Sequence, residues 1–98
     1  MDHLIAYHSY YKPLIRLSQT TGDFDRSDRL FREALRHEPT VGAARPPVND
    51  DELQSANVFF HIHNDYADML WKQGKKQEAA RHDRRADDIK IGAVKYMR

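Results

Sequence analysis

The sequence predicts an all-α fold built from two antiparallel helical hairpins, the second longer than the first. Apolar residues recur at three- and four-residue steps in four segments, which is the spacing of one helix face. β-branched residues are sparse and few windows alternate between apolar and polar residues, so strands are not expected. The chain has four glycines and four prolines, and these residues separate the segments.

The first segment, residues 2–20, places Leu4 and Leu14 on one face and is interrupted by Pro13. A proline inside a helix loses a hydrogen bond and clashes with the preceding turn, which costs about 3 kcal/mol. Either Ser9 caps a helix whose first turn contains Pro13, or one longer helix is kinked at Pro13. Because the apolar stripe already begins at Leu4, we favour the kinked helix.

The second segment, residues 25–37, follows Asp23, a residue type that caps helix N-termini, and stops before Pro39. We expect its apolar stripe to face the first segment, since the two are joined by a short turn at Gly22. This stripe consists of Leu30, Phe31, Ala34 and Leu35.

The third segment, residues 51–73, should be the longest and most buried helix, and Asn49 with Glu52 forms a variant capping box at its start. The fourth segment runs from Lys75 toward the C-terminus with apolar residues on one side and charges on the others. The apolar positions of the third segment are Leu53, Ala56, Val58, Phe59, Phe60, Ile62, Tyr66, Ala67, Met69 and Leu70, and those of the fourth are Ala79, Ala86, Ile89, Ala93 and Met97.

The two halves of the chain repeat one pattern when Gly22 is aligned with Gly74. Glycine permits a tight turn between helices, and small residues at fixed distances beyond it let two antiparallel helices approach closely. The aligned small residues are Ser27 with Ala79 and Ala34 with Ala86, and the aligned upstream residues are Leu14-Ile15 with Tyr66-Ala67.

This spacing resembles the tetratricopeptide repeat family over residues 9–39 and 60–91. The first copy carries Tyr11, Leu14, Gly22, Phe31, Ala34, Leu35 and Pro39, and the second keeps Ala67, Leu70, Gly74, Ala79 and Ala86. The second copy departs from the family at Asp83, where an aromatic residue is usual, and at Ile91, where proline is frequent. An unrelated four-helix bundle is the alternative.

The aligned glycines lie 52 residues apart, whereas the family repeat is about 34 residues. We therefore expect a single domain over residues 1–98 with hairpin one at about 2–38, a proline-rich linker at 39–50 and an elongated hairpin two at 51–97. The segment beyond Ile91 should pack against the early turns of the third segment.

Composition excludes several classes of function. The net charge is +1, which argues against whole-molecule attraction to nucleic acid or anionic membranes. No cysteine is present, so disulfide scaffolds and thiol chemistry are excluded, and a cytoplasmic location is expected. No apolar run approaches the ~20 residues of a membrane span, and the N-terminus lacks the features of a signal peptide.

No cofactor, metal site or catalytic constellation is expected. His61 with Asp65 has the spacing of a metal-binding pair, but two ligands do not make a site, and His63 suits a hydrogen-bonded core position. No nucleophile elbow or glycine-rich phosphate loop occurs, and Asp65 with Asp68 suits a solvated or ligand-facing stripe as well as acid–base chemistry. The chain is therefore expected not to be an enzyme.

A basic cluster over residues 72–85 could contact phosphates. Asp87 and Asp88 follow it at once, however, and mixed charges at helical spacing usually mark a solvated face. Nucleic-acid binding is therefore the weaker alternative for the function.

The family resemblance implies a different surface, because the first helix of each repeat lines a groove that binds a peptide or partner helix. Lys12 matches the lysine that chaperone-binding members use to hold a terminal carboxylate. Arg16 and Asp65 stand where those members have asparagines, so that clamp is not expected. The implied groove residues are Lys12, Arg16, Gln19, His61, Asn64, Asp65, Asp68 and Trp71, with Ser9 beside them; solvated or mutually paired side chains are the alternative.

The sequence thus predicts a non-catalytic protein–protein interaction or adaptor module whose groove takes a ligand of basic or mixed charge. Self-association through the long second hairpin is the alternative with a structural role. Trp71 is either a partly exposed binding anchor or buried against the fourth segment.

Overall fold

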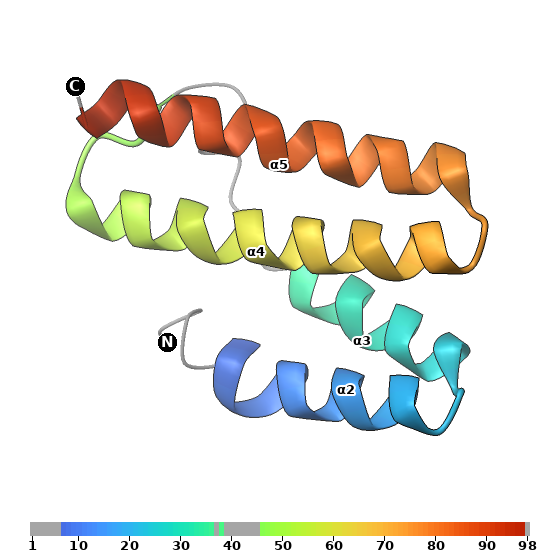
Figure 1. The fold of residues 1–98 in the computed structure, drawn as a ribbon. Helices are drawn as coiled ribbons and strands as arrows, with labels where there is room; N and C mark the ends of the chain where they lie inside the picture. The colour runs from blue at the N-terminus through green and yellow to red at the C-terminus, as the bar shows by residue number, and fades with distance from the viewer. Residues whose placement is uncertain (1–6, 37, 39–45, 98) are drawn as a thin grey trace. The chain divides into compact units, whose positions relative to one another are not determined.

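The computed structural model describes residues 7–36, 38 and 46–97. These residues confirm the all-α prediction, since they contain helices and no strand (Figure 1). The chain divides into two compact units, residues 1–38 and residues 39–98, each with one hairpin. The elements are a π-helical turn η1 (Tyr7–Tyr11) and the α-helices α2 (Lys12–Thr20), α3 (Phe24–Leu35), α4 (Asp50–Lys72) and α5 (Lys76–Met97).

The helical segment before the Gly22 turn changes from a π-helical to an α-helical hydrogen-bond pattern next to Pro13. The π-helical turn η1 leads directly into α2, and Pro13 lies in the first turn of α2. Ser9 lies inside η1 and does not cap α2, whose N-cap position is Tyr11, but Pro13 does fall in the first turn of an α-helix. Each alternative is therefore met in part. π-Helical turns are rare and occur mostly as single turns inside α-helices, and helix geometry also departs from regularity at proline. Leu4, which favoured the kinked helix, lies outside the described residues.

Burial, followed by the charge of Glu33 on α3, raises the pKa of the Tyr11 hydroxyl. The Tyr11 side chain at the end of η1 therefore faces α3 and helps to join the two arms of hairpin one.

Asp23 caps α3 as predicted, because its carboxylate accepts a hydrogen bond from the Arg26 backbone N–H at 3.1 Å. The helix ends at Leu35, and Pro39, which was expected to stop it, lies outside the described residues.

The two hairpin turns are closed by the same pair of backbone hydrogen bonds. Gly22 and Gly74 both have positive φ angles, 79° and 78°, which residues with a side chain rarely adopt. In hairpin one the N–H groups of residues 22 and 23 donate to the carbonyls of residues 19 and 18. In hairpin two those of residues 74 and 75 donate to the carbonyls of residues 71 and 70, which is the same Schellman arrangement.

Small residues lie inside each hairpin at the predicted positions. Ser27 and Ala79, five residues beyond the turn glycines, are both 0% exposed. Ala34 and Ala86, seven residues further on, are also buried. The Ser27 hydroxyl points to the Ile15 carbonyl oxygen at 3.5 Å, so it spans the gap between α3 and α2.

Hairpin two consists of two long helices that pack along their length (Figure 1). Asn49 caps α4 as predicted: its side chain accepts from the Glu52 N–H at 2.9 Å, and the Glu52 carboxylate accepts from the Val48 N–H at 3.4 Å. The α4 helix carries the largest set of buried residues among the described helices, which confirms that expectation.

The end of α5 lies beside the start of α4. The Tyr96 hydroxyl donates to the Asp50 carboxylate at 2.7 Å, and this hydrogen bond raises the pKa of Tyr96. The hairpin is therefore elongated on both arms, as the 52-residue spacing predicts. The apolar positions of α5 are buried at Ala79, Ala86 and Ile89, but the assignment of Met97 to the buried side is wrong, because Met97 is 66% exposed at the helix end.

No helix among the residues described has both the length and the apolar content needed to span a membrane.

Candidate functional site

The predicted site residues of α4 form one stripe along the helix. Their spacing of three and four residues keeps them on a single side. His61 and Asp65 are half-buried, whereas Asn64, Asp68 and Trp71 are exposed. The buried residues of α4 occupy the remaining circumference, so this stripe is the face that hairpin two leaves accessible.

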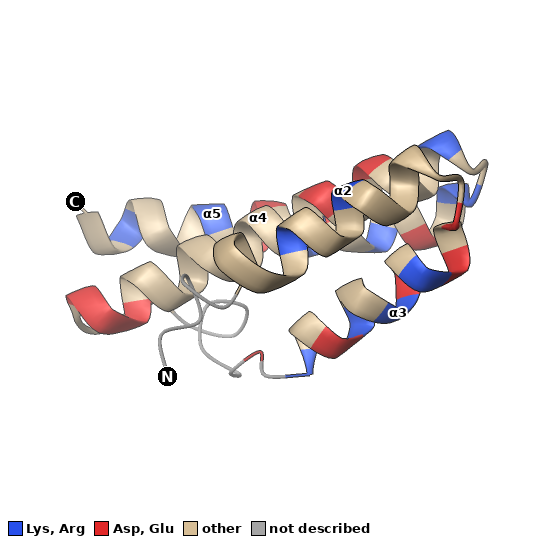
Figure 2. Cartoon of the chain, turned by 90° about the horizontal axis from the view of Figure 1, so that it is seen from below, with Lys and Arg blue, Asp and Glu red and all other residues tan. Residues whose placement is uncertain are grey.

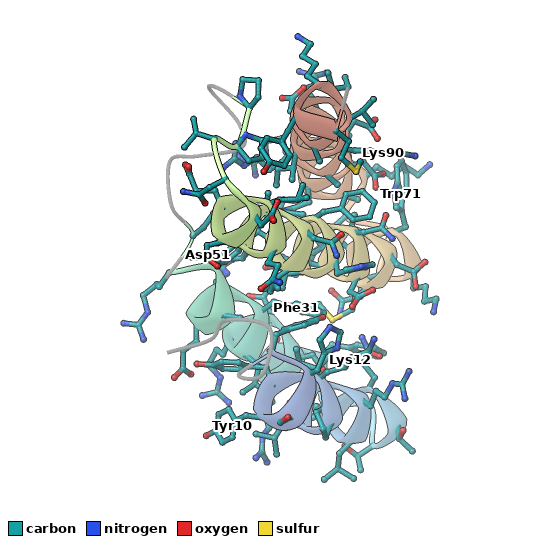
Figure 3. The ribbon with its side chains drawn as sticks, turned by 90° about the vertical axis from the view of Figure 1, so that its left-hand side faces the viewer. Tyr10, Lys12, Phe31, Asp51, Trp71 and Lys90 are labelled. Atoms are coloured by element: carbon teal, nitrogen blue, oxygen red, sulfur yellow. The ribbon has the colours of Figure 1, made fainter. Side chains whose placement is uncertain are left out.

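Trp71 is both exposed and fixed in orientation. Its side chain is 46% exposed, while its indole N–H donates to the Asp83 carboxylate of α5 at 2.8 Å. Figure 3 shows Trp71 at the side of hairpin two. Trp71 is therefore partly exposed and hydrogen-bonded to α5 rather than buried against it, and its role as a binding anchor stays a prediction. Asp83, the position that departs from the tetratricopeptide pattern, is the residue that holds it.

The charged residue nearest to Trp71 on the stripe, Asp68, forms one exposed ion pair. Asp68 pairs with Lys72 one turn later at 3.2 Å, and both side chains are exposed. An ion pair of this kind contributes about 0–1 kcal/mol, so Asp68 can exchange Lys72 for a charged ligand at little cost. Asp68 is three residues from Trp71 and therefore adjacent to it, so the stripe has a carboxylate beside an indole ring, an arrangement suited to a basic side chain.

The predicted residues of α2 also share one side of their helix. Lys12 and Gln19 are half-buried, and Arg16 is exposed. These residues give α2 a basic stripe, in contrast to the acidic stripe of α4. They belong to a different compact unit, so a common groove between the two stripes stays a prediction.

The interior of hairpin two contains a pair of histidines. His63 is only 5% exposed, and its Nδ1 lies 2.8 Å from Nδ1 of His82 on α5. The two rings stack with centroids 5.0 Å apart, and the Tyr66 ring lies 4.5 Å from His82. The expectation of a hydrogen-bonded core histidine at position 63 is confirmed. Sequence reasoning did not identify His82 as its partner, although the 19-residue separation across the Gly74 turn is the signal that could have done so.

Among residues 7–36, 38 and 46–97, no three His, Asp or Glu side chains converge in a way that could hold a metal ion. Figure 2 shows Lys and Arg interspersed with Asp and Glu along the helices. In the basic cluster over residues 72–85, Lys72 is paired with Asp68, and Asp83 accepts from Trp71. This mixture is typical of a solvated face.

No protein-family model matches the chain, and no curated protein or solved structure shows significant similarity to it. The tetratricopeptide resemblance therefore rests on residue spacing and on the matched turns of the two hairpins.

Proposed function

We propose that the chain is a non-catalytic protein–protein interaction module of the tetratricopeptide type that binds a peptide or helix of a partner protein in the cytoplasm. The observation that carries the proposal is the accessible stripe of α4, with Trp71 fixed by Asp83 at one end. Tryptophan is enriched among the residues that dominate binding energy at interfaces. A ring already held in one orientation loses little rotational freedom on binding, which favours affinity.

The charges define the class of partner. Asp68 is adjacent to Trp71 on the stripe, so a lysine or arginine in the partner can meet a carboxylate and an aromatic face together. Asp65 lies about one turn further away. Lys12 and Arg16 on α2 supply the opposite charge for acidic groups elsewhere on the same ligand. The proposed ligand is a segment of mixed charge with at least one basic residue at the α4 stripe.

The test is quantitative affinity capture with the whole chain as bait, followed by mass spectrometry and titration of the captured proteins. Asp68→Lys and Trp71→Ala should each weaken binding of the same proteins about tenfold or more. Arg84→Glu, an exposed charge reversal on α5, is the matched control and should retain them. The melting curves of Asp68→Lys and Arg84→Glu should stay close to that of the parent, since exposed substitutions usually change stability by no more than about 0.5 kcal/mol.

Arg16→Glu tests the α2 stripe separately and should also reduce affinity. If the captured proteins bind Asp68→Lys and Arg16→Glu as tightly as the parent, the proposed surface is wrong. Loss of binding with Arg84→Glu alone would instead place the partner on the basic cluster of α5.

A further inference from the structure

The outer face of α5 changes character along the helix. In its first half the outer positions are mainly charged or small, whereas Ile91 and Val94 in the second half are 54% and 37% exposed. Ile91 and Val94 are three residues apart and therefore adjacent on the helix surface. Large apolar side chains gathered on one exposed helix face mark an interaction surface more often than isolated ones do.

Two opposite charges flank this apolar face symmetrically. Asp87 stands four residues before Ile91, and Lys95 stands four residues after it, so the three residues form one ridge along the helix. Lys95 has no acidic residue three or four positions away with which to pair inside α5. Within the described part of the chain, neither Asp87 nor Lys95 takes part in an ion pair.

The arrangement is complementary to itself. When two copies of α5 are set antiparallel about a two-fold axis through Ile91, Asp87 of each copy faces Lys95 of the other, and Ile91 meets Ile91. In a parallel pair, Asp87 would face Asp87 and Lys95 would face Lys95, which is repulsive. An interface between identical surfaces of this kind closes on itself and produces a dimer.

We propose that the ridge Asp87–Ile91–Lys95, together with Val94, is the contact surface of an antiparallel homodimer formed by the α5 helices of two chains. One helix packed on one helix buries less than the roughly 1,600 Å² of a standard interface, so the dimer is weak and concentration-dependent. The surface lies on α5 and is distinct from the α4 stripe of the proposed function, so one chain can use both.

Sedimentation equilibrium of the full chain over a range of concentrations tests this proposal. The parent should show a reversible monomer–dimer equilibrium. Asp87→Lys and Lys95→Asp should each weaken dimerisation about tenfold, because each substitution turns two attractive pairs into two repulsive ones. An equimolar mixture of the two variants should regain dimers, since every cross-pair is then a lysine opposite an aspartate.

Asp68→Lys is the matched control, because it reverses a charge on α4 and should leave dimerisation unchanged. Ile91→Ser should weaken the dimer regardless of salt, whereas the charge variants should differ from the parent less at high salt. Circular dichroism establishes that each variant keeps the helical content of the parent.

A parent chain that stays monomeric at every concentration would overturn the proposal. So would dimerisation that survives Ile91→Ser, or a mixture of the charge variants that associates no better than either variant alone. Any of these outcomes would show that this face of α5 is not the contact surface of a homodimer.

Discussion

The two hairpins share a turn but differ in how their second helices begin. At the turn, both hairpins have a glycine with positive φ, the same pair of closing hydrogen bonds and a fully buried small residue five positions later. Directly after the glycine, hairpin one has Asp23, whose carboxylate caps α3, whereas hairpin two has Lys75, which cannot accept a hydrogen bond. The backbone geometry is thus determined by the glycine and the small residue, while the cap is an addition.

The interiors of the hairpins also differ. In hairpin one the Ser27 hydroxyl reaches across to α2, and the Tyr11 hydroxyl pairs with Glu33 of α3. In hairpin two the equivalent position is Ala79, and the polar link between the arms is the stacked pair His63–His82 in the next turns. The longer hairpin adds Trp71–Asp83 and Tyr96–Asp50 toward its two ends. Equivalent turns therefore tolerate different polar contacts between the helices they connect.

Overpacking at the helix crossing is the largest effect expected. Ala79→Leu introduces a bulky side chain at a fully buried site, so the free energy of unfolding should fall by about 1–3 kcal/mol. Ala80→Leu is the matched control on the exposed side of α5 and should change it by about 0.5 kcal/mol or less. Chemical denaturation of both variants makes the measurement, and an equal loss for the two would disprove the crossing.

The turn glycines allow a matched comparison of the two hairpins. Gly22→Ala and Gly74→Ala should each destabilise the protein by about 1–2 kcal/mol, because a Cβ at positive φ is strained. A Cβ at either position would meet no atom within 4 Å, so the loss is purely conformational and should be the same at both turns. Thermal or urea unfolding that gives clearly unequal losses would show that the turns are not equivalent.

The missing cap of α5 can be supplied. Lys75→Asp should raise the free energy of unfolding by about 1 kcal/mol, because residue 78 then has the same N–H···carboxylate partner that Arg26 has in hairpin one. Lys75→Ala lacks such an acceptor and should give no comparable gain. The prediction fails if urea titration finds Lys75→Asp no more stable than Lys75→Ala.

The Tyr96–Asp50 contact should produce the smallest effect, and one that depends on pH. The folded pKa of Tyr96 is raised above the ordinary 10.0, so the contact stabilises the fold below pH 10 and its contribution disappears as the pH rises through the raised value. Ultraviolet titration should therefore show that Tyr96, like Tyr11, ionises later than an exposed tyrosine, and Tyr96→Phe should remove the contribution of one tyrosine from that late step. A late step of the same amplitude in Tyr96→Phe as in the parent would indicate that the contact is absent.

Much of the fold could be predicted because its determinants are local. A glycine, a small residue five positions later and a cap each act within about one helical turn, so Gly22, Gly74, Ala79 and Asn49 could be assigned from spacing alone. The α4 stripe also follows from helical periodicity, because residues three and four apart lie on one side of a helix.

The remaining contacts depend on how one helix is aligned along another. His82 contacts His63 and Tyr96 contacts Asp50 only when α4 and α5 are packed against each other, and no short sequence motif indicates either pair. The π-helical turn at Tyr7–Tyr11 lies just before Pro13, and a proline at that position does not by itself indicate whether the preceding residues form an α-helical or a π-helical turn. Met97 follows the apolar spacing of α5 but lies past the last turn that α4 can cover.

The central claim is that the chain contains one hairpin motif twice, and its most direct measurement is the unfolding free energy of Ser27→Leu beside that of Ala79→Leu. Ser27 is as fully buried in hairpin one as Ala79 is in hairpin two, so both variants should lose about 1–3 kcal/mol. Arg29→Leu, on the exposed side of α3, should lose little. If Ser27→Leu unfolds at the same denaturant concentration as the parent while Ala79→Leu does not, the two hairpins are not copies of one motif.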